Sequence, residues 1–150
     1  MIRSILTEPH VRLRDVSEPV TDFGAGLAAL AEDLIETMRA NNGVGIAAPQ
    51  VGISQRVIVV DWGLASGGES LPVVLVNPIV LRASGREALH EACLSVPGIT
   101  REVERATSIE IGAQRTNSLV FSAAAHGLVA RVVLHEIDHL DGRTILRRAA

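Results

Sequence analysis

The stretch GLVARVVLHEIDHLDG, residues 127–142, is the part of this 150-residue chain around which we expect the fold to be organised. Its apolar residues and the glycine at its end predict a helix over about 127–140. On a helix, His135 and His139 lie one turn apart on the same face, so both imidazoles can bind one metal ion. In this H-E-x-x-H pattern Glu136 lies beside the ion, where its carboxylate can handle a proton of a water that the metal activates.

The residues around this motif favour a buried metal site. Two histidines and a glutamate also occur on ordinary exposed helices, and the pentapeptide alone leaves that alternative open. Apolar side chains cover most sides of this helix, however, at Val129, Val132, Val133, Leu134 and Ile137. Because buried polar groups need partners, we expect a metal ion to supply one for the histidines.

A further ligand must come from elsewhere in the chain, and Cys93 is a candidate. It is the one cysteine of the sequence, so it has no partner for an intramolecular disulfide. Taken alone, such a cysteine is more often a small buried apolar residue. Together with two histidines, its thiolate would give three protein ligands and one open position, which is the pattern of a catalytic rather than a structural site.

Composition points to a single domain over residues 1–150. The chain is 47% hydrophobic and 21% charged, which is typical of a globular protein. No window approaches the roughly 18 apolar residues of a membrane span and no secretory signal is visible, so we expect a cytoplasmic protein without membrane contact. The net charge of −3 argues against direct nucleic-acid binding. All basic residues are arginine, which excludes Schiff-base chemistry and Walker-type phosphate loops because both need lysine.

The rest of the sequence predicts an α+β fold. Apolar residues recur at spacings of three and four between 24 and 41, which indicates an N-terminal amphipathic helix after an irregular arm over 2–23. A glycine-rich loop, GVGIAAPQ, follows at 43–50 and is suited to lie against another group. Short β-branched or alternating runs predict antiparallel strands at 56–61, 73–82, 86–93, 103–113 and 118–124. We expect these strands to wrap around the C-terminal metal-binding helix.

The chain resembles the peptide deformylases. That family carries three short motifs, and this sequence shows all three in order: GVGIAAPQ at 43–50, EACLS at 91–95, and HEIDH at 135–139 followed by a leucine. Further matching segments are Leu13-Arg14, Glu18-Pro-Val20, Val76-Asn-Pro78, Ser95-Val-Pro-Gly98 and Gly127-Leu128. The resemblance therefore covers nearly the whole chain, and three motifs in register are far more specific than one.

The resemblance implies removal of the formyl group from the N-terminal formylmethionine of nascent proteins, with release of formate. Carried over position by position, Cys93, His135 and His139 bind the metal and Glu136 is the general base and acid. Family members characteristically use Fe(II), while zinc, nickel or cobalt can occupy the same site. The implied partners are N-formylmethionyl peptides of nascent chains and, transiently, the ribosome.

The same resemblance implies how the substrate is held. The side-chain amide of Gln50 and the backbone N–H of Leu94 would stabilise the developing oxyanion. Gly45 would approach the peptide backbone of the substrate. The apolar pocket for the methionine side chain would be lined by Ile46, Leu128 and Val132.

Two motif positions depart from the family pattern. Ala92 replaces the common glycine of the second motif, and its methyl group could crowd the cleft or restrict the backbone. Leu134 replaces the glutamine that commonly precedes the third motif, and this change would remove a hydrogen-bonding amide from the surroundings of the ligands. His90 and His126, which flank two of the motifs, are interpreted as incidental.

Three alternatives stay open at this point. The first is a related hydrolase that prefers a different N-formyl substrate. The second is a zinc peptidase, for which Asp141 is the only downstream residue that offers a third ligand. The third is a non-catalytic homologue, against which the joint presence of Gln50, Cys93 and Glu136 argues, because a protein that only binds needs no proton shuttle.

Overall fold

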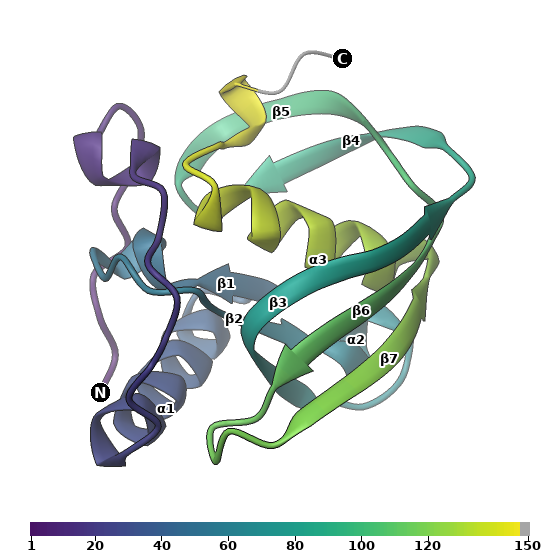
Figure 1. The fold of residues 1–150 in the computed structure, drawn as a ribbon. Coiled ribbons are helices and arrows are strands. Elements are labelled where there is room, and N and C mark those ends of the chain that lie inside the picture. Colours follow the sequence, from purple (N-terminus) through teal and green to yellow (C-terminus); the bar gives the residue numbers. More distant parts are fainter. Residues whose placement is uncertain (148–150) are drawn as a thin grey trace.

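The structure is a computed structural model, and it describes residues 1–147. Helix α3 (Gly127–Leu140) lies between a five-stranded sheet and a two-stranded sheet (Figure 1). No helix in this described part of the chain has the length and apolar character needed to cross a membrane. The other elements, in chain order, are η1 (Val11–Arg14), α1 (Ala25–Ala40), β1 (Gly45–Ala47), η2 (Ala48–Val51), β2 (Val57–Asp61), α2 (Trp62–Ala65), β3 (Pro72–Ser84), β4 (Glu87–Cys93), β5 (Val96–Arg105), β6 (Ser108–Gln114), β7 (Val120–His126) and η3 (Ile145–Arg147).

The five-stranded sheet is antiparallel and has the order β1-β2-β3-β6-β7. Residues that alternate along β2 belong to two different cores, because successive side chains of a strand point to opposite faces. Ile58 and Val60 pack in the cluster that includes α3, whereas Val57 and Val59 pack in the cluster that includes α1. The two long helices therefore cover opposite faces of the sheet at its β1–β2 end.

Helix α1 follows the expectation for residues 24–41. Leu27, Leu30, Leu34 and Met38 are buried, and their spacing forms the apolar face that packs on the sheet. The helix ends at Ala40, and the following Asn41 caps it, with a side chain that donates a hydrogen bond to the carbonyl of Thr37 at 2.8 Å. This end brings the chain directly into the glycine-rich loop.

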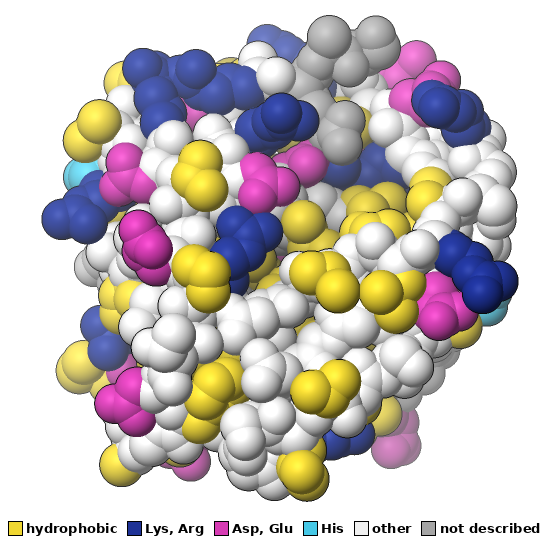
Figure 2. Space-filling view, viewed as in Figure 1, with side chains coloured by type: hydrophobic (Ala, Val, Ile, Leu, Met, Phe, Trp, Pro, Cys, Tyr) yellow, Lys and Arg dark blue, Asp and Glu magenta, His cyan; other side chains and the backbone are white. Residues whose placement is uncertain are grey.

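The N-terminal arm is irregular apart from η1, as expected, and is held near its C-terminal end. Val20 is fixed by the side chain of Asn77, which accepts from its N–H at 2.8 Å and donates to its carbonyl at 3.0 Å. Glu18 forms an isolated bridge with Gln55. Arginine side chains gather over the region of η1 and η3 on the face shown in Figure 2, although charged side chains of both signs occur on that face.

One predicted strand is wrong. Residues 103–113 do not form a single strand, because β5 ends at Arg105 in the two-stranded sheet and β6 begins at Ser108 in the five-stranded sheet. Apolar and polar residues alternate across this boundary, so the pattern cannot reveal that the chain changes sheets. The loop at 43–50 is also more regular than expected, since it contains β1 and η2.

Leu34 offers a test of the packing between α1 and the sheet. Its side chain is fully buried, so we expect Leu34→Ala to lower the free energy of unfolding by about 2–5 kcal/mol through lost burial and a residual cavity. Urea denaturation would measure the change. Leu119→Ala is the control, since Leu119 is 62% exposed and its truncation should change stability by less than about 0.5 kcal/mol. Equal effects of the two substitutions would contradict this packing.

Candidate active site

Three potential metal ligands converge between α3 and the end of β4. The sulfur of Cys93 lies 3.3 Å from Nε2 of His139, and the ligand atoms of Cys93, His135 and His139 all lie within 4.8 Å of one another. The helix supplies both histidines from adjacent turns, as the H-E-x-x-H spacing predicts. The structure therefore brings together the thiolate and the two imidazoles named from the sequence.

The polar groups at this point fit a metal ion. Within the described residues, Oε1 of Glu136 and Nδ1 of His139 are buried and have no hydrogen-bond partner. Burial lowers the pKa of His139, which favours the neutral imidazole that a metal requires. Burial would also lower the pKa of His135, but Cys93 and Glu91 raise it to about 10. Cys93 and Glu91 therefore favour positive charge at this imidazole, and a divalent cation would supply that charge in place of the Nε2 proton.

The ring of His135 is oriented by a carboxylate that sequence reasoning left without a role. Nδ1 of His135 lies 2.8 Å from Oε1 of Glu91, which leaves Nε2 available for the metal. Glu91 also accepts two hydrogen bonds from Arg105, at 2.6 and 2.8 Å. Burial would raise the pKa of Glu91, but the hydrogen bonds from Arg105 and His135 lower it to about 2. Glu91 is therefore ionised and holds the imidazole in one tautomer.

Arg105 links the hairpin to the metal-binding helix. Its side chain is 1% exposed and also donates to Asp138 of α3 at 2.8 Å. The sequence contained a signal for this network, since Glu91 and Asp138 stand inside two of the motifs. The sequence contained no signal for Arg105, because this residue lies outside all three motifs. Its side chain reaches Glu91 and Asp138 only in the folded chain.

Glu136 lies against the glycine of the first motif. A Cβ on Gly45 would approach Oε2 of Glu136 and Cγ1 of Val132, each to 2.6 Å, so only glycine permits this approach of α3 to β1. Glu136 is 4% exposed. Burial raises the pKa of its carboxyl to about 7, although His135 and Arg105 oppose the rise. A carboxyl with a pKa near neutrality can both accept and donate a proton.

The amide of Gln50 is held in one orientation. Its Oε1 accepts from the backbone N–H of Ala47 at 2.9 Å, so Nε2 must be the atom that points toward the metal ligands. Nε2 lies 3.1 Å from Oγ of Ser95 and 3.9 Å from Sγ of Cys93. The residue comes from η2, which is a single turn that follows β1 directly. The side-chain N–H groups of Gln50 therefore point toward the metal-ligand cluster that contains the thiolate of Cys93.

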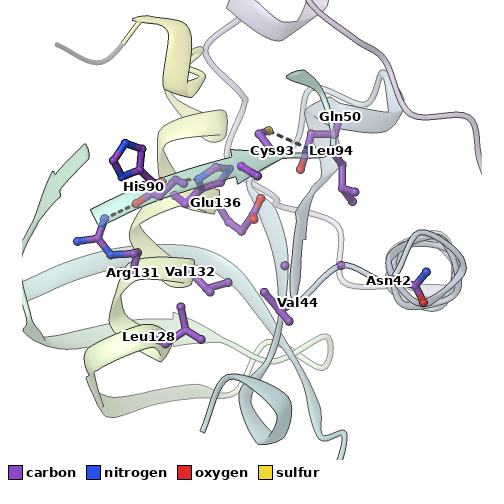
Figure 3. Close-up of a pocket in the computed structure, with 15 residues that line it drawn as sticks. Asn42, Val44, Gln50, His90, Cys93, Leu94, Leu128, Arg131, Val132 and Glu136 are labelled. Atoms are coloured by element: carbon purple, nitrogen blue, oxygen red, sulfur yellow. Dashed lines mark hydrogen bonds and ion pairs between the residues drawn. The ribbon is translucent and has the colours of Figure 1, made fainter. Parts of the chain in front are cut away.

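These groups open into a cavity of about 380 Å³. Figure 3 shows Gln50, Cys93 and Leu94 on one side of it and Leu128, Val132 and Arg131 on the other, with Glu136 between them. Of the residues named from the sequence, the following line it: Gly45, Gln50, Cys93, Leu94, Leu128, Val132, His135 and Glu136.

Ile46 does not line the cavity, and the expectation for this residue is corrected. Its side chain is fully buried in the cluster beneath α1. Strand alternation is the reason, because Ile46 pairs with Val59 on the α1 face of the sheet while Gly45 and Ala47 face α3. Val44, which precedes the strand, lines the cavity instead.

The two departures from the motif pattern have different surroundings. Ala92 is exposed on β4 at the rim of the cavity. Its φ is not positive, so the alanine does not need the left-handed backbone conformation that favours glycine. Leu134 does not line this cavity but a separate one, together with Ala106 and Arg105.

The flanking histidines also differ in position. His90 lines the cavity, so it lies closer to the site than the sequence suggested. His126 lies 3.0 Å from Oγ of Ser108, at the start of α3. Asp141, the third ligand that a zinc peptidase would need, is exposed and pairs with Arg56 at 3.1 Å. It does not belong to the ligand cluster, which argues against the peptidase alternative.

The chain matches the family model for polypeptide deformylase over residues 2–150. A peptide deformylase from Dictyoglomus thermophilum is 46% identical over 149 residues, which cover 99% of this chain and 94% of that protein. A solved peptide deformylase from Thermotoga maritima aligns with a TM-score of 0.92 at 39% identity and covers 100% of this chain and 99% of its own. A class I type b peptide deformylase from Acinetobacter baumannii, solved with Met-Ala-Ser bound, aligns with a TM-score of 0.91 at 33% identity and covers 99% of both chains.

These matches span the parts of the chain that build the site. The family model includes all three motifs, and the Thermotoga structure extends along both sheets and both long helices. The α+β fold expected from the sequence is therefore confirmed, with antiparallel strands around a C-terminal helix that carries two metal ligands. The chain belongs to the peptide deformylase family, and its Cys93, His135 and His139 form the metal site of a metal-dependent hydrolase.

Proposed function

We propose that this chain removes the formyl group from N-terminal formylmethionine of nascent peptides and releases formate. The observation that carries the proposal is the cluster of Cys93, His135 and His139, with the unpartnered Oε1 of Glu136 beside it. The amide of Gln50 faces the same cluster. Together these groups offer what hydrolysis of an unreactive formamide needs, namely an activated water, a proton carrier and a donor for the oxyanion.

The metal would be held by the three ligands, and we propose Fe(II) as the ion used in the cell. Zinc, nickel or cobalt would fit the same mixed set of one thiolate and two imidazoles. When bound, the ion would supply Lewis acidity, which polarises the formyl carbonyl and lowers the pKa of a water.

Glu136 carries the proton in this proposal. Its carboxylate accepts a proton from the attacking water as oxygen bonds to the formyl carbon, and donates it to the amine nitrogen as the C–N bond breaks. The products are formic acid, which releases its proton to give formate, and a peptide with a free amino terminus, so one water is consumed and the proton carrier is restored. The pKa of about 7 for this buried carboxyl supports the assignment, because it suits both half-steps near neutral pH.

The oxyanion would be stabilised by two N–H donors, one from the side chain of Gln50 and one from the backbone of Leu94. A donor of this kind contributes roughly 3 kcal/mol in comparable sites. The hydrogen bond from Ala47 to Oε1 of Gln50 supports this role, because the amide is oriented before the substrate arrives.

The methionine side chain would enter the apolar part of the cavity, beside Leu128, Val132 and Val44. The peptide backbone of the substrate would lie along the chain at Gly45, since β1 is an edge strand of the five-stranded sheet. The Acinetobacter baumannii relative, which was solved with Met-Ala-Ser bound, supports a peptide that begins with methionine as the ligand of this cavity.

Loss of the proton carrier is the most direct test of the mechanism. We expect Glu136→Ala, loaded with Ni(II) or with Fe(II) under anaerobic conditions, to release formate from formyl-Met-Ala-Ser about 100- to 10,000-fold more slowly than the wild type. Metal content should stay the same, because Glu136 is not one of the three ligands. Glu104→Ala is the control, since that side chain is 50% exposed and pairs with the exposed Arg86. Unchanged turnover in Glu136→Ala would refute the mechanism.

The donor role of Gln50 is tested by Gln50→Glu. The carboxylate keeps an acceptor for the N–H of Ala47 but replaces the amide donors by a second acceptor. We expect kcat for formyl-Met-Ala-Ser to fall about 100- to 1,000-fold. Metal content, measured in parallel, separates this effect from loss of the ion. A variant that keeps its metal and the wild-type kcat would leave Gln50 without a catalytic role.

We further propose that the whole chain acts as one catalytic domain in the cytoplasm and contacts the ribosome transiently, because formylated amino termini emerge there. Ribosomes that carry formyl-Met nascent chains should retain the protein on sedimentation at low salt and release it at high salt. Ribosomes without nascent chains are the comparison. Failure to sediment with either kind of ribosome would count against the contact and leave the deformylase proposal intact.

A further inference from the structure

Arg131 is a buried arginine on the metal-binding helix to which neither the motifs nor the mechanism assigns a role. It lies one turn before His135 and is 7% exposed. Its Nη1 donates to Oε2 of Glu91 at 2.6 Å and to the carbonyl of Val103 at 2.8 Å. Its Nη2 donates to the carbonyl of Glu87 at 2.6 Å. All three contacts go to the β4–β5 hairpin, and Figure 3 shows the side chain on the far side of the cavity from Gln50.

The metal ligands are divided between two parts of the fold. His135 and His139 stand on α3, whereas Cys93 ends β4. Within the described residues, β4 and β5 pair only with each other, so no backbone ladder ties this hairpin to the five-stranded sheet. The distance between thiolate and imidazoles therefore depends on side chains that join the hairpin to α3.

Arg105 and Arg131 make most of the charged contacts across this junction, but in different ways. Arg105, on the hairpin, binds carboxylates only, at Glu91 and at Asp138 of α3. Arg131, on α3, binds one carboxylate and also a backbone carbonyl on each strand of the hairpin. A planar guanidinium can hold three such acceptors at once, while an ammonium group cannot match that geometry.

We propose that Arg131 is a positioning residue for the metal site. It holds both strands of the hairpin against α3, so that Cys93 stays within reach of His135 and His139. It also fixes Oε2 of Glu91, whose other oxygen orients His135. The inference rests on the metal-binding part of the proposed function and is independent of the substrate.

The test is the affinity of the apo-protein for Co(II), measured in competition with a chelator. Arg131→Met keeps the aliphatic stem that lines the cavity and removes all three hydrogen bonds, while Glu91 keeps both bonds to Arg105. We expect Co(II) affinity to fall about 10- to 100-fold, as it does when groups that support metal ligands are removed. The thiolate-to-cobalt absorption band should weaken as well, because it reports whether the sulfur of Cys93 still binds.

Two further variants make the result specific. Arg131→Lys retains the charge but cannot reach all three acceptors, so its affinity should lie between those of the wild type and Arg131→Met. Arg56→Met is the matched control, because Arg56 also donates to a carbonyl and a carboxylate, at Leu140 and Asp141, but these lie at the C-terminal end of α3 and not on the β4–β5 hairpin. It should bind Co(II) with the wild-type affinity and spectrum even if its melting temperature falls.

The proposal is overturned if folded Arg131→Met binds Co(II) with the wild-type affinity and absorption band. If that variant does not fold, Arg131→Lys decides: a Co(II) affinity below that of the wild type supports the proposal, and wild-type affinity overturns it. A wild-type protein that binds Co(II) but releases no formate from formyl-Met-Ala-Ser would instead refute the proposed function and leave the role of Arg131 standing.

Discussion

The carboxylate of Glu91 is the interaction on which the rest of the site depends. It accepts hydrogen bonds from Arg105 and Arg131 and orients His135, so one side chain joins β4, β5, α3 and a metal ligand. An unpaired carboxylate at this depth would cost several kcal/mol, and its partners are therefore as necessary as the group itself. Since Glu91 is also two residues before Cys93, the same strand delivers a ligand and the group that orients another ligand.

A second constraint is the close approach of α3 to the edge strand at Gly45. Any side chain there would collide with Glu136 and Val132, so the absence of a Cβ sets how near the carboxylate lies to the strand. The two constraints act from opposite sides of the helix. The hairpin orients His135, Gly45 of the edge strand sets the position of Glu136, and the cavity lies where the two meet.

The long helices were predictable because their signals are local. The spacing of Leu27, Leu30 and Leu34 follows the period of a helix whatever lies opposite, and so does the pair of histidines. The division of the predicted strand at 103–113 was not predictable, because alternation looks the same whichever sheet a strand joins. The assignment of Ile46 failed for a related reason, since a three-residue strand gives too short a pattern to show which face meets α3.

The sequence by itself determined the chemistry: a thiolate, two imidazoles one helical turn apart and an adjacent carboxylate, with an α+β order of elements around them. The spacing of residues along a helix shows which side chains share a face, and no tertiary contact is needed to see it. Only the tertiary structure decided how the parts are held, because Arg105, Arg131 and Glu91 meet across sequence separations of 14 and 40 residues. Which buried charges pair depends on their positions in the folded protein, and these side chains come together only when the β4–β5 hairpin packs on α3.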